Sequence, residues 1–144
     1  MKVDFWQLSR DRAEQVVALI AGRVIAAGER LLVVSEDEQQ RAQIAAQLWD
    51  AGPESFLANG MADAPGAERQ PILIGAGMGD ANGASHVILA DGIWRQPTGF
   101  ERAFLLFGEP TLDAARAAWR GLDGESDVER AFFRQDEGKW VKVG

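Results

Sequence analysis

Apolar and polar positions alternate along the chain in blocks that predict strands and helices in turn. The short apolar runs at residues 3–8 and 30–35 are typical of strands, and the second is of the fully buried kind. Between them, apolar residues recur at helical spacing over 16–24, and a second helical stretch carries Ala42, Ala45, Leu48 and Trp49 before Gly52. A strand–helix–strand–helix order at this spacing predicts βαβ units and a parallel sheet.

The later blocks extend this order. Further short strands are expected at Ser55 (SFL), Pro71 (PILIG), His86 (HVILA) and Arg102 (RAFLLF). A third helix is expected over 110–122, residues 58–68 have the composition of a loop, and the end of the chain predicts a hairpin turning at 136–138. We therefore expect an α/β fold in a single domain, residues 1–144. It would be a three-layer α/β/α sandwich with a mostly parallel sheet and a C-terminal hairpin.

The helix ends carry sequence signals of their own. Asp11 with Glu14 has the spacing of a capping box, in which two side chains bond each other's backbone amides. Ser35 with Glu38 repeats that spacing before the second helix. Gly28 suits the left-handed residue that ends many helices. These signals predict that the first two helices open at Asp11 and Ser35.

Composition excludes several classes of function. The 144 residues carry a net charge of −7, so nucleic-acid phosphates should be repelled, and an anionic partner would need a local basic patch. The chain has no cysteine, which excludes a disulfide scaffold, a thiolate metal site and a cysteine nucleophile. No apolar run approaches the roughly 20 residues of a membrane span, and no secretion signal is visible, so a cytoplasmic location is expected.

The stretch PILIGAGMGDANG places Gly75, Gly77 and Gly79 directly after an apolar run, as a dinucleotide-binding loop would. A GxGxxG pattern starting at Gly75 would put Asp80 in the third glycine position, and the following residues favour a turn and a strand over a helix. We therefore expect a glycine turn between two strands and no cofactor. A nucleotide-binding enzyme with a degenerate loop stays open as an alternative.

Other chemistry has weaker support. A Ser/His/Asp triad would have to use His86, the one histidine, which lies in a strand-like run beside Ser85. The acidic run at 36–38 could bind a divalent metal, but carboxylates at a helix start normally interact with the helix dipole. The sequence therefore predicts no catalytic residue and no metal site.

Across nearly the whole chain the residues resemble one protein family. The stretch LLVVSEDEQQRAQIAAQLWDAGPESFLANG, with its Leu-Trp at 48–49 and Ser-Phe at 55–56, is similar to the chi subunit of bacterial DNA polymerase III holoenzyme. The segments RQPILI, FERAFLLF, ARAAWRGL and QDEGKWVKV add to the resemblance. One departure is Ala58 with Asn59, where family members often carry Pro-His.

The resemblance implies a Rossmann-like fold without a working nucleotide site and a connector without catalytic activity of its own. Chi proteins act in the clamp-loader assembly during DNA replication. One surface binds the psi subunit, which implies psi-binding roles for Phe56 and Trp49. Another surface binds the acidic C-terminal tail of single-stranded DNA-binding protein (SSB), which implies roles for Arg116, Trp119 and Arg120.

The third helix gives a physical reason for such a tail site. Arg116 and Arg120 are four residues apart and share a helix face with Trp119 beside it. Two guanidinium groups can bind carboxylates, and an indole ring offers a wall for an apolar side chain. Trp119 is also in register with Ala115 and Leu122, so core packing is an alternative. Core packing is likewise open for the two aromatic residues assigned to psi, and a stand-alone peptide-binding module remains a rival function.

Overall fold

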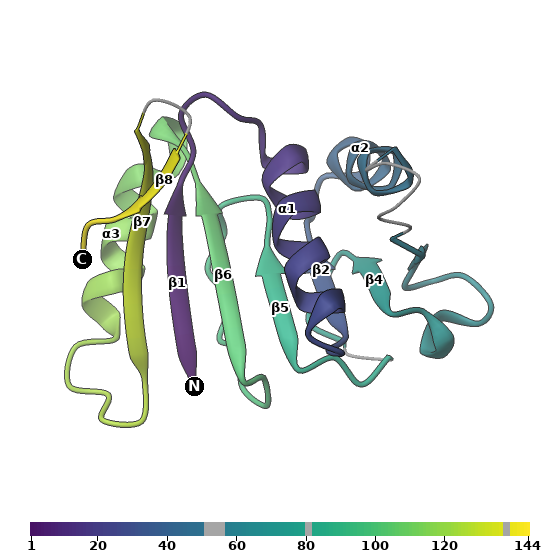
Figure 1. Cartoon of the computed structure of the whole chain (residues 1–144). Coiled ribbons are helices and arrows are strands. Elements are labelled where there is room, and N and C mark those ends of the chain that lie inside the picture. Colours follow the sequence, from purple (N-terminus) through teal and green to yellow (C-terminus); the bar gives the residue numbers. More distant parts are fainter. Residues whose placement is uncertain (51–56, 80–81, 137–138) are drawn as a thin grey trace.

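One eight-stranded sheet organises the computed structural model, which describes residues 1–50, 57–79, 82–136 and 139–144. The strand order is β3-β4-β2-β5-β6-β1-β7-β8, and the pairs are parallel except for β7 with β8 (Figure 1). The strands are β1 (Lys2–Gln7), β2 (Leu31–Val34), β3 (Asn59–Met61), β4 (Ile72–Gly75), β5 (His86–Leu89), β6 (Arg102–Phe107), β7 (Glu129–Asp136) and β8 (Lys139–Lys142). The expected mostly parallel sheet with a C-terminal hairpin is confirmed.

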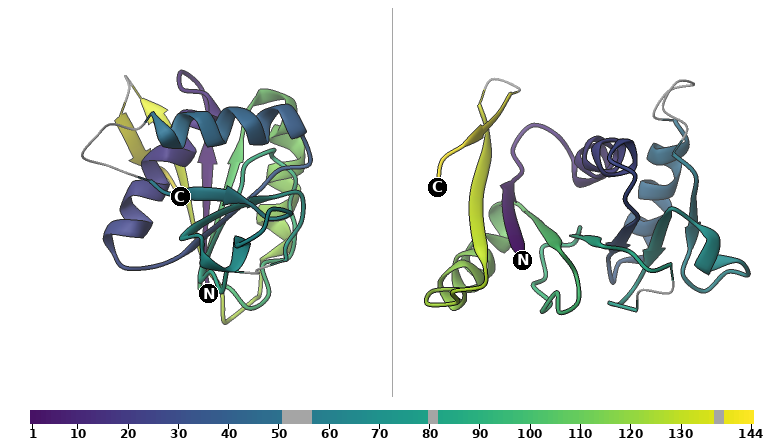
Figure 2. Two further views of the ribbon diagram at one scale, coloured as in Figure 1. Left: turned by 90° about the vertical axis from the view of Figure 1, so that its right-hand side faces the viewer. Right: turned by 60° about the horizontal axis from the view of Figure 1, so that its bottom comes forward.

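Helices cover both faces of this sheet. The described residues contain α1 (Ala13–Ala26), α2 (Glu38–Trp49) and α3 (Leu112–Gly121), with 3-10 turns η1 (Ala67–Arg69) and η2 (Glu109–Thr111). The first two helices lie on one face and α3 lies on the other, which gives the expected three layers (Figure 2). Among the described residues, no helix is both long and apolar enough to cross a membrane.

The core lies on both sides of the sheet, which explains the continuous apolar runs of the central strands. Successive residues of a strand point to opposite faces. In β2, Leu31 and Val33 pack with α1 and α2, whereas Leu32 and Val34 belong to the cluster on the α3 side. A parallel strand covered on both faces has no solvent-facing position, so every residue can be apolar.

The first helix does not open as its sequence spacing predicts. The residue that precedes α1 is Arg12, whose backbone N–H donates to the side-chain oxygen of Gln15 at 3.0 Å. The capping box expected from Asp11 and Glu14 is therefore wrong by one residue. Asp11 instead accepts a hydrogen bond from Gln135 Nε2 at 2.9 Å and so joins the start of α1 to β7.

The second helix is also capped by a neighbour of the expected residue. The carboxylate of Asp37 accepts hydrogen bonds from the backbone N–H groups of Gln39 and Gln40 at 3.0 and 3.3 Å. Ser35 instead accepts from the Asp37 amide at 3.2 Å and bonds the Gln40 side chain. The predicted Ser35–Glu38 capping box is therefore wrong, and α2 begins at Glu38, two residues later than a cap at Ser35 would place it.

The end of α1 confirms the predicted glycine cap. Gly28 has φ +79° and donates its N–H to the Ile25 carbonyl at 2.9 Å, while Glu29 donates to the Val24 carbonyl at 3.1 Å. This pair of hydrogen bonds is the Schellman motif, and its left-handed residue favours glycine. The motif fixes the backbone of Glu29 as the chain turns toward β2.

The edge strand near α2 differs from the prediction. The strand expected at Ser55 lies mostly outside the described residues, and β3 is found instead at Asn59–Met61. Strand β3 falls within residues 58–68 and η1 begins there at Ala67, so the expectation of a plain loop is wrong. Pairing with β4 creates this strand, because the sequence Asn-Gly-Met has little strand propensity of its own.

Candidate functional site

Two exposed arginines and two aromatic rings meet beside α3. Arg116 and Arg120 lie on its outer surface, and Trp119 lies between them and the sheet. Together with Phe132 of β7, these three residues line a shallow cavity of about 190 Å³. The structure therefore brings together the three residues assigned to the acidic tail and adds a fourth.

Trp119 is held in place by contacts on several sides. Its ring meets Phe5 edge-on at a centroid distance of 5.1 Å and meets Phe132 edge-on at 6.0 Å. The guanidinium of Arg130 lies 4.4 Å from the indole centroid and also donates to the Trp119 carbonyl. Trp119 is half-buried, so it packs on the core and still lines the cavity.

The arginines of this cavity carry charge that the fold does not use. Within the described residues, neither Arg116 nor Arg120 forms an ion pair. Arg130, by contrast, is paired with Asp123. The cavity therefore offers two available guanidinium groups beside an apolar wall.

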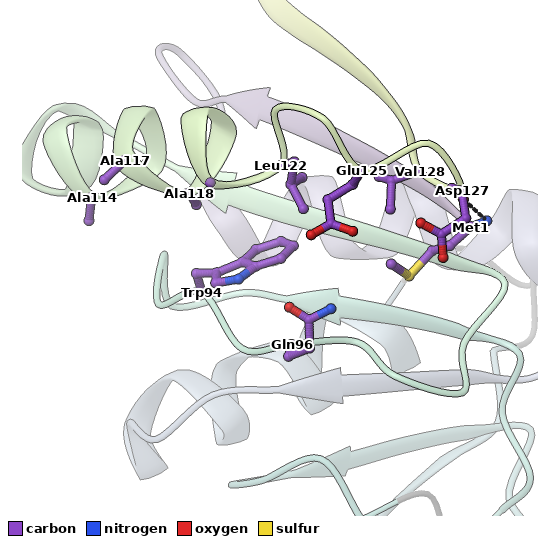
Figure 3. A pocket seen from close by; sticks show the side chains of 11 residues that line it. Met1, Trp94, Gln96, Ala114, Ala117, Ala118, Leu122, Glu125, Asp127 and Val128 are labelled. Atoms are coloured by element: carbon purple, nitrogen blue, oxygen red, sulfur yellow. Dashed lines mark hydrogen bonds between the residues drawn. The ribbon is translucent and has the colours of Figure 1, made fainter.

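A larger cavity, of about 490 Å³, lies on the opposite side of α3 and has the opposite character (Figure 3). Its walls are alanines of α3 and the ring of Trp94, which stacks on Phe5 at a centroid distance of 6.1 Å. Glu125 and Asp127 contribute carboxylates to its lining. An acidic ligand would be repelled there, so its size does not make it the better site for an acidic tail.

The residues assigned to psi are placed only in part. Phe56 lies outside the described residues. Trp49 is the last residue of α2 and is 51% exposed, so most of its surface does not belong to the core. It lies on the other face of the sheet from α3 and near the opposite edge, so the two surfaces are separate (Figure 1).

The glycine stretch leads from one strand toward the next. Strand β4 ends at Gly75, and the described residues 76–79 and 82–85, which precede β5 at His86, contain no helix. This confirms the expected turn between two strands. A dinucleotide site needs a helix N-terminus after the glycine loop, because the helix amides bind the pyrophosphate.

Asp91 joins the loops that follow the carboxyl ends of β2 and β5. Its carboxylate accepts a hydrogen bond from the Glu36 backbone amide at 2.9 Å and pairs with Arg95. Burial disfavours the charged form, but hydrogen bonds from Arg95, Glu36 and Ile93 outweigh it and hold the pKa of Asp91 below its usual value. Here an amide that could bind a phosphate already binds a carboxylate.

His86 does not form a catalytic triad with its neighbours. The Ser85 hydroxyl donates to Glu29 Oε2 at 2.7 Å and lies 2.8 Å from His86 Nδ1. The serine therefore stands between the acid and the imidazole, whereas a triad needs the imidazole in the middle. Burial is the main reason that the pKa of His86 is lowered, with Arg102 lowering it further against the opposing effect of the two nearby glutamates.

The sequence missed two residues that contact Trp119, of which Phe132 also lines the cavity. Arg130 and Phe132 come from β7, and their side chains lie on the α3 side, two positions apart. Strand alternation gives this shared face. What alternation cannot give is the pairing of β7 with β1, which brings that face next to α3.

One protein-family model matches most of the chain. The family model described as DNA polymerase III chi subunit, HolC, matches residues 1–126, which run from β1 through α3. No curated protein matches the chain at a significant level. The two arginines lie within the matched range and Phe132 lies beyond it. The chain belongs to the DNA polymerase III chi subunit family.

Proposed function

We propose that this chain is a non-catalytic accessory subunit of DNA polymerase III that links the psi subunit to the acidic C-terminal tail of SSB. Family membership supports the role in replication. The observation that carries the tail assignment is the cavity lined by two exposed arginines, Trp119 and Phe132 in a chain of net charge −7.

The chemistry of this cavity fits an acidic peptide that ends in an apolar residue. The guanidinium groups of Arg116 and Arg120 can each bind a carboxylate with two hydrogen bonds. The rings of Trp119 and Phe132 provide an apolar wall for the last side chain of the tail. Because the rest of the chain is acidic, attraction comes from this patch alone and acts over a short range.

The proposed psi surface lies around Trp49 and Phe56. An exposed tryptophan at a helix end is a typical anchor of a protein interface. Helices α2 and α3 lie on opposite faces of the sheet (Figure 2), which leaves room for two partners at once. A connector needs this separation, because each partner must bind without displacing the other.

Two rival functions predict different behaviour. A nucleotide-using enzyme would need free donors at the carboxyl ends of the strands, where Asp91 accepts from the Glu36 amide and Asp37 accepts from the first amides of α2. A stand-alone peptide-binding module would bind the SSB tail but not psi. Only the connector binds both partners in one complex.

The test is assembly of that complex from purified psi, SSB and this chain, followed by size-exclusion chromatography. We expect the three proteins to elute together. With SSB that lacks its C-terminal tail, we expect SSB to separate while psi stays bound. If psi and SSB displace each other, or if tail removal changes nothing, the proposed connector role is wrong.

A further inference from the structure

Three metal-binding side chains converge at the amino ends of β5 and β6, away from the surfaces described above. Glu29 follows α1, His86 opens β5, and Glu101 precedes β6. One ligand atom from each lies within 4.8 Å of the other two. We propose that Glu29, His86 and Glu101 form a binding site for a divalent transition-metal ion, of which Zn²⁺ is the best match.

The backbone holds the three side chains at fixed origins. Glu29 donates its N–H to a carbonyl at the end of α1 at 3.1 Å, as part of the Schellman motif. His86 donates to the Arg30 carbonyl at 3.4 Å, and Glu101 donates to the Ser85 carbonyl at 2.8 Å. Ligand convergence therefore depends on the sheet, and only side-chain rotation is left to complete a coordination shell.

Ser85 ties two of the ligands together. Its hydroxyl lies 2.7 Å from Glu29 Oε2 and 2.8 Å from His86 Nδ1. Hydrogen bonds of this kind orient metal ligands and restrict their motion before the ion arrives. Glu29 keeps its second carboxylate oxygen for the ion, because the serine bonds only one of the two.

The donor set selects the class of metal. One imidazole and two carboxylates are nitrogen and oxygen ligands that Zn²⁺ accepts, whereas Mg²⁺ prefers oxygen ligands alone. A tetrahedral Zn²⁺ with bonds of about 2.1 Å holds its ligand atoms about 3.4 Å apart, so the glutamates must close in by rotation. Glu101 is exposed and free to do so.

The charged groups around the site are of both signs. The two carboxylates face the guanidinium of Arg102, and Arg23 lines the same small cavity as His86 and Arg102. Arg102 is itself paired with the buried Asp4 and lies 4.8 Å from the centroid of Phe104, so its charge is partly neutralised. Three protein ligands leave at least one coordination position for water or a partner group.

His86 makes the test direct, because it is the one histidine of the chain and gives a single set of imidazole signals in an NMR spectrum. The protein is titrated with Zn²⁺ after any affinity tag has been removed, and binding is measured in parallel by calorimetry. Co²⁺ then serves as a paramagnetic probe. We expect one Zn²⁺ ion to bind per chain and to shift the imidazole signals. Co²⁺ at the same site should shift these signals much further, because it is paramagnetic.

Variants separate ligation from folding. Glu101→Gln changes an exposed side chain and should weaken Zn²⁺ binding at least tenfold without lowering the melting temperature, and His86→Ala should abolish it. Glu68→Gln, an exposed glutamate elsewhere, should bind Zn²⁺ like the unchanged chain. The proposal would be overturned if the imidazole signals did not change in excess Zn²⁺, or if Glu101→Gln bound Zn²⁺ with unchanged affinity.

Discussion

Arg95 binds both carboxylate oxygens of Asp91, with 2.9 Å from Nη1 to Oδ1 and 2.8 Å from Nη2 to Oδ2. The same carboxylate accepts from the backbone amides of Glu36 and Ile93 at 2.9 and 3.2 Å. These bonds join the loops that follow β2 and β5. In doubly wound sheets the crevice at such strand ends is the usual ligand site. In this chain an ion pair lies at these strand ends.

Asp91→Asn should destabilise the protein in a pH-dependent way. Hydrogen bonds outweigh burial and lower the pKa of Asp91 from its unfolded value of 3.8, so the charged carboxylate stabilises the fold above that pH. This stabilisation is lost as the pH falls through the lowered folded pKa. Urea unfolding should give a loss of about 1–3 kcal/mol for the variant at pH 7. The difference should shrink at strongly acidic pH.

Asp63→Asn is the matched control, because Asp63 is exposed. It should leave the free energy of unfolding nearly unchanged at both pH values. An Asp91→Asn loss that is equally large in acid would show that the cause is packing and not the charge.

Gly77 in the glycine stretch should tolerate a methyl group. A Cβ at Gly77 meets no atom within 4 Å, so Gly77→Ala should leave the melting temperature nearly unchanged. Gly92 is the contrast: it has φ +77°, and a Cβ there would lie 2.8 Å from Thr111 Oγ1. Gly92→Ala should therefore cost about 1 kcal/mol or more by thermal or urea unfolding.

The same stretch should bind no nucleotide. Because the described part of it contains no helix and the Glu36 amide after β2 already binds Asp91, calorimetry with ATP and with NAD should show no heat of binding. A micromolar nucleotide site that Gly77→Ala removes would contradict this and would favour the enzyme alternative.

The sequence alone could predict those elements whose apolar pattern shows that they are buried. The run at Leu31–Val34 had to be a buried strand, because four apolar residues in a row leave no polar face. Asn59–Met61 carries no such signal and becomes a strand only by pairing with β4. The predicted capping residues were wrong for a related reason. Several polar residues lie at each helix start, and the fold decides which of them accepts from the free backbone amides.

The residues of the candidate sites also include some that the sequence could predict and some that it could not. The spacing of Arg116 and Arg120 on one helix face follows from helical periodicity, so the sequence could predict it. The contribution of Phe132 depends on β7 entering the sheet beside β1, and the convergence of Glu29 with His86 depends on β5 pairing with β2. Contacts between distant strands are set by topology, which no local pattern records.

Trp49→Ala should separate interface from core at the psi surface. Trp49 is 51% exposed, so the variant should keep a melting temperature close to that of the unchanged chain. If Trp49 anchors psi, its truncation should cost about 2 kcal/mol, or about thirtyfold in affinity, as measured by calorimetry. Phe56→Ala is predicted to behave in the same way. Gln43→Ala, an exposed change on the same helix, is the control.

A loss of psi affinity together with several degrees of stability would assign the residue to the core instead. Unchanged affinity in both aromatic variants would mean that psi binds elsewhere on the chain. Neither result would bear on the proposed tail site, because α3 lies on the opposite face of the sheet.

Arg116→Ala should weaken binding of the SSB tail without unfolding the domain. Arg116 is exposed and, within the described residues, makes no ion pair, so the fold does not depend on its charge. A charge-assisted hydrogen bond contributes about 1.5–3 kcal/mol, so we expect a loss of about tenfold or more in affinity. Fluorescence anisotropy with a labelled tail peptide measures it. Arg69→Ala, an exposed arginine far from α3, should bind normally.

Salt separates this electrostatic mechanism from apolar docking alone. The net charge of −7 repels an acidic peptide at long range, while the two arginines attract it at contact. The Debye length falls from about 10 Å at 0.1 M to about 3 Å at 1 M salt, so added salt should weaken binding by screening that contact attraction. The Arg116→Ala variant should respond less steeply, because it has lost one of the charges. Salt-independent binding, or a variant that binds like the unchanged chain, would place the tail elsewhere and leave α3 a structural helix.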